Sequence, residues 1–287
     1  MTIKQKTLQL NLRKIYYLLS PSLRLLIRRI YYLPSDMAGQ LFAKNKALMP
    51  PKGLIFTGPG DFIAIGLKYR TYFIDLGGLK PEHQVLDVGS GIGRMAIPLT
   101  GYLTSGSYEG FDIVKKGVDW CTKNISRRYP DFRFTHISLR NDLYSSTGDT
   151  AQKFRFPYPD ASFDFVFLTS VFTHMLPAEV EQYMNEITRV LKPHGRCLAT
   201  FFILNEYSVT GMQQNPDFNF PFNKGYYRLM DDSVQSANVA YDEGYIQKTL
   251  ASENNLRIVS SHYGYWSGRP KEQSTDYQDI VVFEKTT

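Results

Sequence analysis

The stretch "VLDVGSGIGR", residues 85–94, decides the fold of this chain. Apolar residues dominate its first half, as in a buried strand, and three glycines at alternate positions follow. Glycine has no Cβ atom, so a loop built from it can turn tightly and let the backbone approach a ligand closely. A strand that ends in such a loop is typical of α/β proteins that bind nucleotide-like molecules.

Strand-like and helix-like segments alternate after this loop. The hydrophobic pattern predicts strands at residues 84–89, 107–113, 132–138, 163–169, 196–202, 256–263 and 279–285. It predicts helices at residues 62–79, 92–103, 115–128, 178–191 and 242–254. Helical connections give a parallel sheet with helices on both faces, and the last two strands have no helix between them. We therefore expect an α/β, Rossmann-like, seven-stranded and mostly parallel sheet with an antiparallel last strand.

The 287 residues are enough for one large domain with extensions. We expect a basic helical extension or cap at residues 1–60 and a main domain at residues 61–287. Two helical patterns lie within residues 8–33, and Pro34 is expected to end the second. Residues 203–242 interrupt the alternation and are rich in Asn, Asp, Gly and aromatic residues, which predicts an irregular insertion that acts as a lid.

Positive charge is concentrated at the start of the chain. Residues 1–50 contain nine Lys and Arg and one acidic residue, whereas the remaining residues contain 24 basic and 26 acidic ones. A nucleic-acid enzyme more often carries its positive field around the cleft, so no nucleic-acid partner is expected. The basic helices favour either a cap over the ligand or a peripheral contact with an anionic membrane surface.

The spacing of the cysteines and the hydropathy of the chain indicate where in the cell we expect the protein. Cys121 and Cys197 lack the spacing of a zinc site or a disulfide framework. No apolar run reaches the ~20 residues that span a bilayer, and the first residues do not resemble a secretory signal. We therefore expect a reduced, cytoplasmic protein without a metal, peripheral to the membrane at most.

Three details distinguish the ligand classes that such a loop could bind. Its spacing is G-x-G-x-G, not the G-x-G-x-x-G that accommodates a pyrophosphate. Asp87 lies two positions before the first glycine, where its carboxylate suits a cationic ligand better than an anionic one. The chain contains no Tyr-x-x-x-Lys pair of the kind that serves Rossmann reductases. These details favour the sulfonium cation S-adenosylmethionine over a dinucleotide.

Three ordered motifs resemble those of class I S-adenosylmethionine-dependent methyltransferases, in the UbiE-like branch (methyltransferase types 11 and 25). The stretch "VLDVGSGIGR" is similar to the first motif of that class. The segments "FPYPDASFDFVFLTSVFTH", residues 156–174, and "EITRVLKPHGRCLATFF", residues 186–202, resemble the regions around its fourth and fifth strands. The resemblance covers about residues 80–202 and the last two strands, and it implies S-adenosylmethionine as the cofactor.

The resemblance also implies roles for individual residues, carried over by position. The expected cofactor contacts are Asp87, Gly89, Gly91 and Gly93 for the methionine part, Asp112 for the ribose, Ile113 and either Leu139 or Asn141 for the adenine, and Thr169 at the end of a strand.

Fewer sequence features indicate which residues bind the methyl acceptor. An oxygen acceptor generally needs a base near the methyl group, and His174 is the candidate; alternatively it packs or caps the following helix. Tyr265, Trp266 and Arg269 could line an acceptor pocket, with Arg269 facing a carboxylate, phosphate or sugar. The alternative is a packed connection in which Trp266 belongs to the core.

We therefore expect methyl transfer from S-adenosylmethionine to a small or medium-sized acceptor, at an oxygen of a hydroxylated metabolite, a glycan or a lipid-linked intermediate. The alternatives are an N-methyltransferase and a non-catalytic partner protein that binds S-adenosylmethionine. The loop spacing disfavours a Rossmann oxidoreductase. The aromatic insertion suits a lid over a partly apolar acceptor or a contact in a homodimer.

Overall fold

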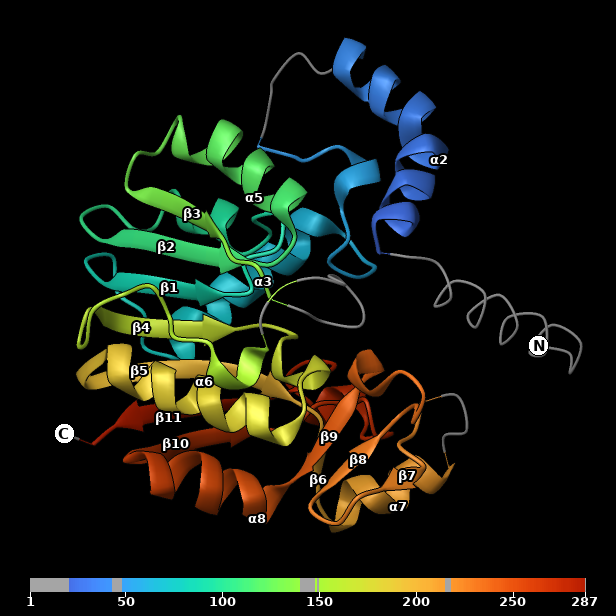
Figure 1. The fold of residues 1–287 in the computed structure, drawn as a ribbon, viewed down its shortest axis with the longest axis vertical. Coiled ribbons are helices and arrows are strands. Elements are labelled where there is room, and N and C mark those ends of the chain that lie inside the picture. Colours follow the sequence, from blue (N-terminus) through green and yellow to red (C-terminus); the bar gives the residue numbers. More distant parts are fainter. Residues whose placement is uncertain (1–20, 43–47, 140–147, 149, 215–217, 287) are drawn as a thin grey trace, which may run out of the picture.

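The computed structural model describes residues 21–42, 48–139, 148, 150–214 and 218–286 (Figure 1). The main sheet contains seven strands in the order β10-β11-β5-β4-β1-β2-β3. Its strands are β1 (Gln84–Val88), β2 (Ser107–Asp112), β3 (Phe132–His136), β4 (Phe163–Leu168), β5 (Leu191–Phe201), β10 (Leu256–His262) and β11 (Asp279–Lys285). β11 is antiparallel to both β10 and β5, and the other strand pairs of this sheet are parallel, which confirms the predicted fold class.

The helices lie on both faces of the sheet, with α6 in front of it and α3 behind it in Figure 1. The α-helices are α2 (Pro21–Phe42), α3 (Phe62–Asp75), α4 (Ala96–Leu99), α5 (Lys115–Cys121), α6 (Pro177–Val190), α7 (Glu206–Gln214) and α8 (Glu243–Tyr245). Shorter 3-10 and π turns are η1 (Lys52–Leu54), η2 (Thr122–Ser126), η3 (Ala151–Lys153), η4 (Phe172–His174), η5 (Gln235–Ala237), η6 (Ile246–Ala251), η7 (Ser252–Asn254) and η8 (Lys271–Gln273). Among the described residues, no helix has the length and apolar character needed to cross a membrane.

Both faces of the central strands are buried, which is why their sequences are almost continuously apolar. Leu86 and Val166 belong to the core on the face that α6 covers. Val85 and Phe165 belong to the core on the opposite face, where Phe73 of α3 packs. The strands are therefore held between two apolar layers, and their polar loops gather at the ends of the sheet.

The helix α2 continues through Pro34, so the expectation that this proline ends the helix is wrong. Proline lacks the N–H that would bond to the carbonyl four residues earlier. Asp36 holds the helical turn that follows Pro34. Its carboxylate accepts hydrogen bonds from the backbone N–H groups of Lys52 and Gly53 at 2.7 and 3.0 Å. The helical pattern expected before residue 20 lies outside the described residues.

The helix expected at residues 92–103 is reduced to the single α-helical turn α4. Gly93, with a φ of 79°, and Pro98 both lie in the expected range. A positive φ is incompatible with an α-helix, so the helix cannot begin before this glycine. The sequence pattern therefore predicted a helix that is too long, because the apolar residues at these positions are buried whether or not the backbone is helical.

The described residues between 203 and 242 are not irregular, which corrects that expectation. They contain a second sheet in the order β6-β9-β8-β7. Its strands are β6 (Ile203–Leu204), β7 (Phe222–Asn223), β8 (Tyr227–Leu229) and β9 (Val239–Asp242). Phe202, Phe218 and Phe220 pack around Trp266 in a separate small core, which supplies the apolar burial that orders this segment.

The carboxylate of Asp279 connects the two sheets at the start of β11. It is 2% exposed and accepts hydrogen bonds from the backbone N–H groups of Ile203 and Gly264 and from the indole N–H of Trp266, at 2.6, 2.7 and 2.7 Å. Burial raises the pKa of Asp279 to about 6, while these three donors oppose the shift. The carboxylate thus fixes the point where the second sheet leaves the first.

Replacing Asp279 by alanine should lower the free energy of unfolding by about 3 kcal/mol or more, because each buried donor left without a partner costs about 1–3 kcal/mol. Urea denaturation followed by tryptophan fluorescence measures the change. Asp232→Ala is the matched control, since Asp232 is exposed and forms a surface ion pair with Lys224 at 2.8 Å. That control should change stability by about 0.5 kcal/mol or less. Equal midpoints for Asp279→Ala and the wild type would contradict the assignment.

Candidate functional site

A cavity of about 590 Å³ lies where loops follow the carboxyl ends of β1, β2, β3 and β4. β1 is hydrogen-bonded to β4 on one side and to β2 on the other, so the order of the strands reverses there. In open α/β sheets, ligands bind at this reversal. The size of the cavity is that of a typical small-molecule site.

The glycine loop forms one wall of the cavity. Gly89 and Gly91 line it and have φ angles of 84° and 57°, which favour glycine. A Cβ atom at Gly89 would lie 2.5 Å from Cγ2 of Val171, and one at Gly91 would lie 2.7 Å from Cγ2 of Thr57. These two positions therefore need glycine both for the turn and for the space across the cavity.

Gly93 does not line the cavity, which corrects its expected place among the cofactor contacts. A Cβ atom there would lie 2.7 Å from Cδ1 of Ile125 and 3.0 Å from the sulfur of Cys121. The third glycine thus lets the segment η2 and the end of α5 pack closely against the loop. Its role is in packing rather than in ligand contact.

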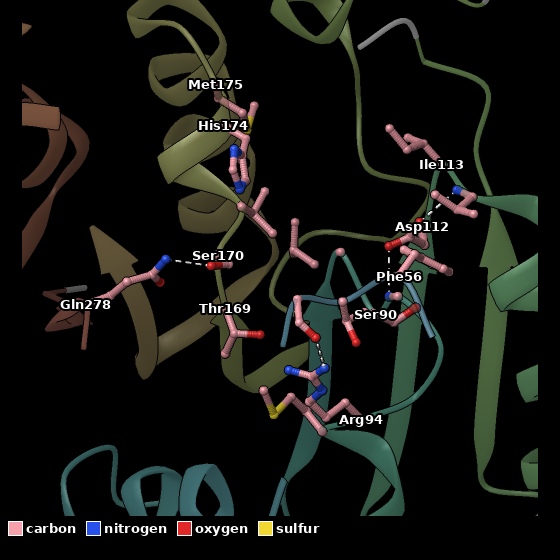
Figure 2. A pocket seen from close by; sticks show the side chains of 18 of the residues that line it. Phe56, Ser90, Arg94, Asp112, Ile113, Thr169, Ser170, His174, Met175 and Gln278 are labelled. Atoms are coloured by element: carbon pink, nitrogen blue, oxygen red, sulfur yellow. Dashed lines mark hydrogen bonds between the residues drawn. The ribbon is translucent and has the colours of Figure 1, made fainter. Parts of the chain in front are cut away.

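Asp112, at the end of β2, lines the cavity beside Ile113 (Figure 2). One carboxylate oxygen accepts the backbone N–H of Gly91 at 2.7 Å, and the other accepts that of Val114 at 2.7 Å. Burial raises the pKa of Asp112, while these backbone donors oppose the shift. The same carboxylate therefore fixes the glycine loop and remains at the surface of the cavity.

The structure does not bring Asp87 to the cavity, which corrects its expected contact with the methionine part. Its side chain is 1% exposed and accepts a hydrogen bond from the hydroxyl of Tyr108 at 2.5 Å. Burial raises the pKa of Asp87 to about 8, while the hydrogen bond from Tyr108 opposes the shift. The side chain lies in the core beside Tyr108 and is not among the residues that line the cavity.

The opposite wall follows β4 and contains Thr169, Ser170 and His174 (Figure 2). Ser170 has a φ of 58°, a strained conformation for a residue other than glycine. Its N–H donates to Oγ1 of Thr200 at 2.8 Å, and its hydroxyl accepts from Nε2 of Gln278 at 2.6 Å. These bonds hold the strained turn at the cavity.

The ring of His174 is held by the second sheet's segment. Nδ1 of His174 lies 3.0 Å from the carbonyl oxygen of Ser236, and because a carbonyl only accepts, this pair requires a hydrogen on Nδ1. Burial lowers the pKa of His174, and the carbonyls of Ser236 and Ala237 oppose the shift. The imidazole is therefore neutral at pH 7.

Sequence reasoning missed the walls that come from distant parts of the chain. Residues 56–59 and Lys68 and Tyr69 of α3 line the cavity, as do residues 276–278 before β11. Nζ of Lys68 lies 2.6 Å from a carboxylate oxygen of Asp276, which joins the two segments. No motif marked these residues, because their contact arises only from the topology of the sheet.

The three residues expected to contact the acceptor lie in three different environments. Tyr265 lines the cavity. Trp266 does not, because its side chain is 1% exposed and belongs to the small core. Arg269 does not line it either; its guanidinium stacks on the rings of Tyr207 and Tyr263, at 4.1 and 5.0 Å from their centroids. The expectations for Trp266 and Arg269 are therefore corrected.

The expected adenine contacts are only partly described. Leu139 lines the cavity together with Ile113 and Ile137, and these three side chains form an apolar wall. Asn141, the alternative contact, lies outside the described residues. Within the described part of the chain, no group of three or more His, Cys, Asp or Glu side chains is arranged to hold a metal ion.

The cavity fits S-adenosylmethionine chemically. The hydroxyl groups of Thr57 and Ser90 are buried at its wall without a hydrogen-bond partner, and a polar ligand would satisfy them. The carboxylate of Asp112 can accept hydrogen bonds from ribose hydroxyls, and the apolar wall suits a base.

Comparisons with known proteins agree with this chemistry. Residues 86–199 match the family described as a methyltransferase domain. Phosphoethanolamine N-methyltransferase 3 of Arabidopsis thaliana is 28% identical over 233 residues, which are 78% of this chain and 42% of that protein. Phthiotriol/phenolphthiotriol dimycocerosates methyltransferase of Mycobacterium tuberculosis is 33% identical over 132 residues, 46% of this chain and 41% of that protein. The chain thus spans less than half the length of these two relatives.

The fold comparison extends beyond the matched domain. The crystal structure of the PH0226 protein from Pyrococcus horikoshii superposes with a TM-score of 0.55 at 15% identity, over 87% of this chain and 98% of that chain. That likeness concerns the fold alone. The glycine loop and the cavity walls that follow β1, β2, β3 and β4 lie within the segment that matches the methyltransferase domain family.

Proposed function

We propose that this chain methylates an oxygen atom of a small or medium-sized hydroxylated acceptor, with His174 as the general base. A hydroxylated metabolite, a glycan or a lipid-linked intermediate would meet this description. The observation that carries the proposal is the place of the His174 ring in the wall of the cavity, where the carbonyl of Ser236 holds its Nδ1.

The protein's contribution to the reaction is alignment and proton removal. S-adenosylmethionine supplies a methyl group on a sulfonium ion, which a nucleophile displaces in line. Asp112 and the glycine loop would orient the ribose and methionine parts, and the wall of Ile113, Ile137 and Leu139 would hold the adenine. Holding donor and acceptor in one geometry supplies much of the rate enhancement in such reactions.

His174 has the protonation state that a base needs. A lowered pKa keeps the imidazole unprotonated at neutral pH, so it can accept the proton of an acceptor hydroxyl. The hydrogen bond to the Ser236 carbonyl fixes the orientation of the ring. The same carbonyl stabilises the imidazolium that forms after the proton is taken.

In this proposal the acceptor binds where Tyr69, Tyr265, Tyr277 and Gln278 line the cavity, which we call the acceptor end. These residues combine aromatic rings with hydrogen-bonding groups. Lys68 and Asp276 are paired there, so their charges largely cancel. Such a lining supports an acceptor with an apolar part and several hydroxyl groups rather than a strongly charged one.

Transfer to an amine nitrogen is the second candidate. The tyrosine rings at the acceptor end can contact an ammonium group through cation–π interactions. The similarity to phosphoethanolamine N-methyltransferase 3 supports the same reading. An amine acceptor that is already unprotonated would need no base, so His174 distinguishes the two candidates.

Replacing His174 by alanine should lower kcat for an oxygen acceptor by about 10²- to 10⁴-fold, the usual contribution of a general base. The affinity for S-adenosylhomocysteine should not change. Because the base must be unprotonated, kcat/KM of the wild type should fall as the pH drops through the lowered pKa of His174, and this acidic limb should be lost in the variant. Release of S-adenosylhomocysteine across panels of hydroxylated and amine acceptors gives the rates.

His262→Ala is the matched control, because His262 lies on β10 and its Nε2 pairs with the Ser260 hydroxyl at 2.9 Å. It should leave kcat and the pH profile unchanged. An unchanged kcat in His174→Ala with an oxygen acceptor would remove His174 from the mechanism. Turnover of amines alone would favour the second candidate.

We also propose that α2 binds an anionic membrane surface. Arg24, Arg28 and Arg29 lie on this helix, and no acidic residue precedes Asp36 in it. Figure 1 places α2 on the outside of the molecule, on the side of the carboxyl ends of the strands. Seven large apolar side chains among its described residues are between 41% and 76% exposed: Leu23, Leu26, Ile27, Ile30, Tyr31, Leu33 and Met37.

A basic helix with exposed apolar residues is typical of proteins that lie in the membrane interface. Its position near the cavity would suit delivery of a lipid-linked acceptor. The full chain should sediment with vesicles that contain anionic lipid and much less with neutral vesicles, and added salt should weaken the binding.

Ile27→Glu combined with Ile30→Glu, or removal of residues 1–35, should release the chain from anionic vesicles. The matched control is Leu67→Glu, because Leu67 of α3 is 41% exposed, as Leu23 of α2 is. This control should bind vesicles like the wild type. Equal partitioning of the wild type, the double variant and the shortened chain would rule out a membrane contact through α2.

A further inference from the structure

Lys68 and Asp276 form an ion pair in the wall of the cavity. Lys68 belongs to α3 and Asp276 to the loop before β11, and Nζ of the lysine lies 2.6 Å from Oδ1 of the aspartate. The side chain of Lys68 is 44% exposed, whereas that of Asp276 is 6% exposed. The cation of the pair therefore lies on the solvent side, and the carboxylate lies on the buried side.

The two oxygens of the Asp276 carboxylate have different surroundings. Oδ1 accepts hydrogen bonds from Nζ of Lys68 at 2.6 Å and from the backbone N–H of Tyr277 at 2.7 Å. Oδ2 is buried and has no hydrogen-bond partner among the described residues. A buried carboxylate oxygen without a donor is costly. A bound molecule that donates a hydrogen bond to Oδ2 would remove this cost.

Lys68 offers the complementary group beside this oxygen. A lysine ammonium carries three N–H groups, so the bond to Asp276 leaves donors for a second acceptor. The pair thus presents a hydrogen-bond donor and a hydrogen-bond acceptor next to each other at the cavity. A ligand that uses both needs an acceptor atom and a donor group that are equally close together.

The charges of the pair favour a neutral ligand. The carboxylate of Asp276 is already balanced by Lys68, and an ammonium group at Oδ2 would be held close to the lysine cation, which would repel it. The hydroxyl of Tyr69 adds no charge, because burial and the nearby carboxylate of Asp276 raise the pKa of Tyr69 well above its ordinary value. A hydroxyl group can donate to Oδ2, and a hydroxyl on the next carbon atom can accept from Lys68. Two adjacent hydroxyl groups of one molecule therefore fit the pair.

Aromatic rings line the cavity beside the pair. They belong to Tyr69, Tyr265 and Tyr277. The rings of Tyr265 and Tyr277 meet edge to face, with centroids 5.3 Å apart. Such rings are rigid and largely apolar, so they can pack against the C–H groups of a ligand while neighbouring polar groups bind its hydroxyls. A sugar ring combines C–H faces with adjacent hydroxyl groups at its edge.

We propose that Lys68 and Asp276 bind two adjacent hydroxyl groups of a sugar ring and thereby select a sugar as the methyl acceptor. Oδ2 of Asp276 accepts a hydrogen bond from one hydroxyl, and Nζ of Lys68 donates one to the next. The inference rests on the proposed function because it places the acceptor at this end of the cavity. It does not require His174 to act as the base.

The test measures sugar binding to the full chain saturated with S-adenosylhomocysteine, so that no methyl transfer is needed. The probes are the methyl glycosides of glucose, galactose and mannose and their 2-, 3- and 4-deoxy analogues, which lack one ring hydroxyl at a time. Affinities come from NMR titrations. At least one parent glycoside should bind, and loss of either contacted hydroxyl should weaken binding by about 10- to 100-fold, the range expected for hydrogen bonds to charged groups.

Two variants remove the acceptor and the donor separately. Asp276→Asn keeps the size of the side chain without its charge, and Lys68→Met keeps the apolar part of the lysine. Each should weaken the parent glycoside by about 10-fold or more and abolish the preference for it over the deoxy analogue that lacks the corresponding hydroxyl. The affinity for S-adenosylhomocysteine should not change, which shows that each variant is folded.

Lys115→Met and Asp119→Asn are the matched controls. These two residues form an ion pair of 2.7 Å on α5, their side chains are 65% and 57% exposed, and neither lines the cavity. Both controls should bind the parent and deoxy glycosides as the wild type does. A free sugar and its methyl glycoside distinguish the two sources of such a ring, since a site for the terminal residue of a glycan cannot require a free anomeric hydroxyl.

Three results would overturn the proposal: no binding of any parent glycoside, equal weakening of the parent and deoxy glycosides in the variants, or tighter binding of amines that depends on Asp276. If Asp276→Asn does not fold, Lys68→Met decides, because that side chain is partly exposed. Glycosides that bind through the pair but are not methylated would contradict the proposed oxygen transfer and would leave the contact with the pair in place.

Discussion

The hydrogen bond from the Gly91 N–H to the carboxylate of Asp112 is the interaction on which the site depends. It joins the loop after β1 to the end of β2, and the second oxygen of the same carboxylate holds the N–H of Val114. The N–H groups of Gly89 and Ser90 donate to the carbonyl of Phe111, at 2.9 and 3.0 Å. These bonds turn the loop away from the line of the strand, and the space left above β1 is the cavity.

The cavity is then closed by segments that are far apart in the chain. The pair of Lys68 and Asp276 joins α3 to the loop before β11, and the hydroxyl of Tyr72 donates to the carbonyl of Thr275 at 2.6 Å nearby. Arg94 holds the carbonyl of Gly58 on the adjoining wall. The segments before β1 and before β11 therefore meet at the cavity, while the loops after the strands form its floor.

The strands could be predicted because burial on both faces requires almost continuous runs of apolar residues. The same alternation explains the error at Asp87. Val85 and Asp87 lie on the same face of β1, since side chains two residues apart point the same way. Val85 packs in the core that contains Tyr108, so Asp87 faces that core and not the loop. The alternation of side chains along β1 therefore places Asp87 in the core beside Tyr108.

Other features could not be read from the sequence because they depend on partners distant in the chain. Trp266 and Tyr265 are adjacent aromatic residues in one loop, yet one is buried beside Phe202 and the other lines the cavity. Their separation follows from the bond between the Trp266 indole and Asp279. No local pattern distinguishes these two outcomes, since either aromatic residue satisfies the same local preferences.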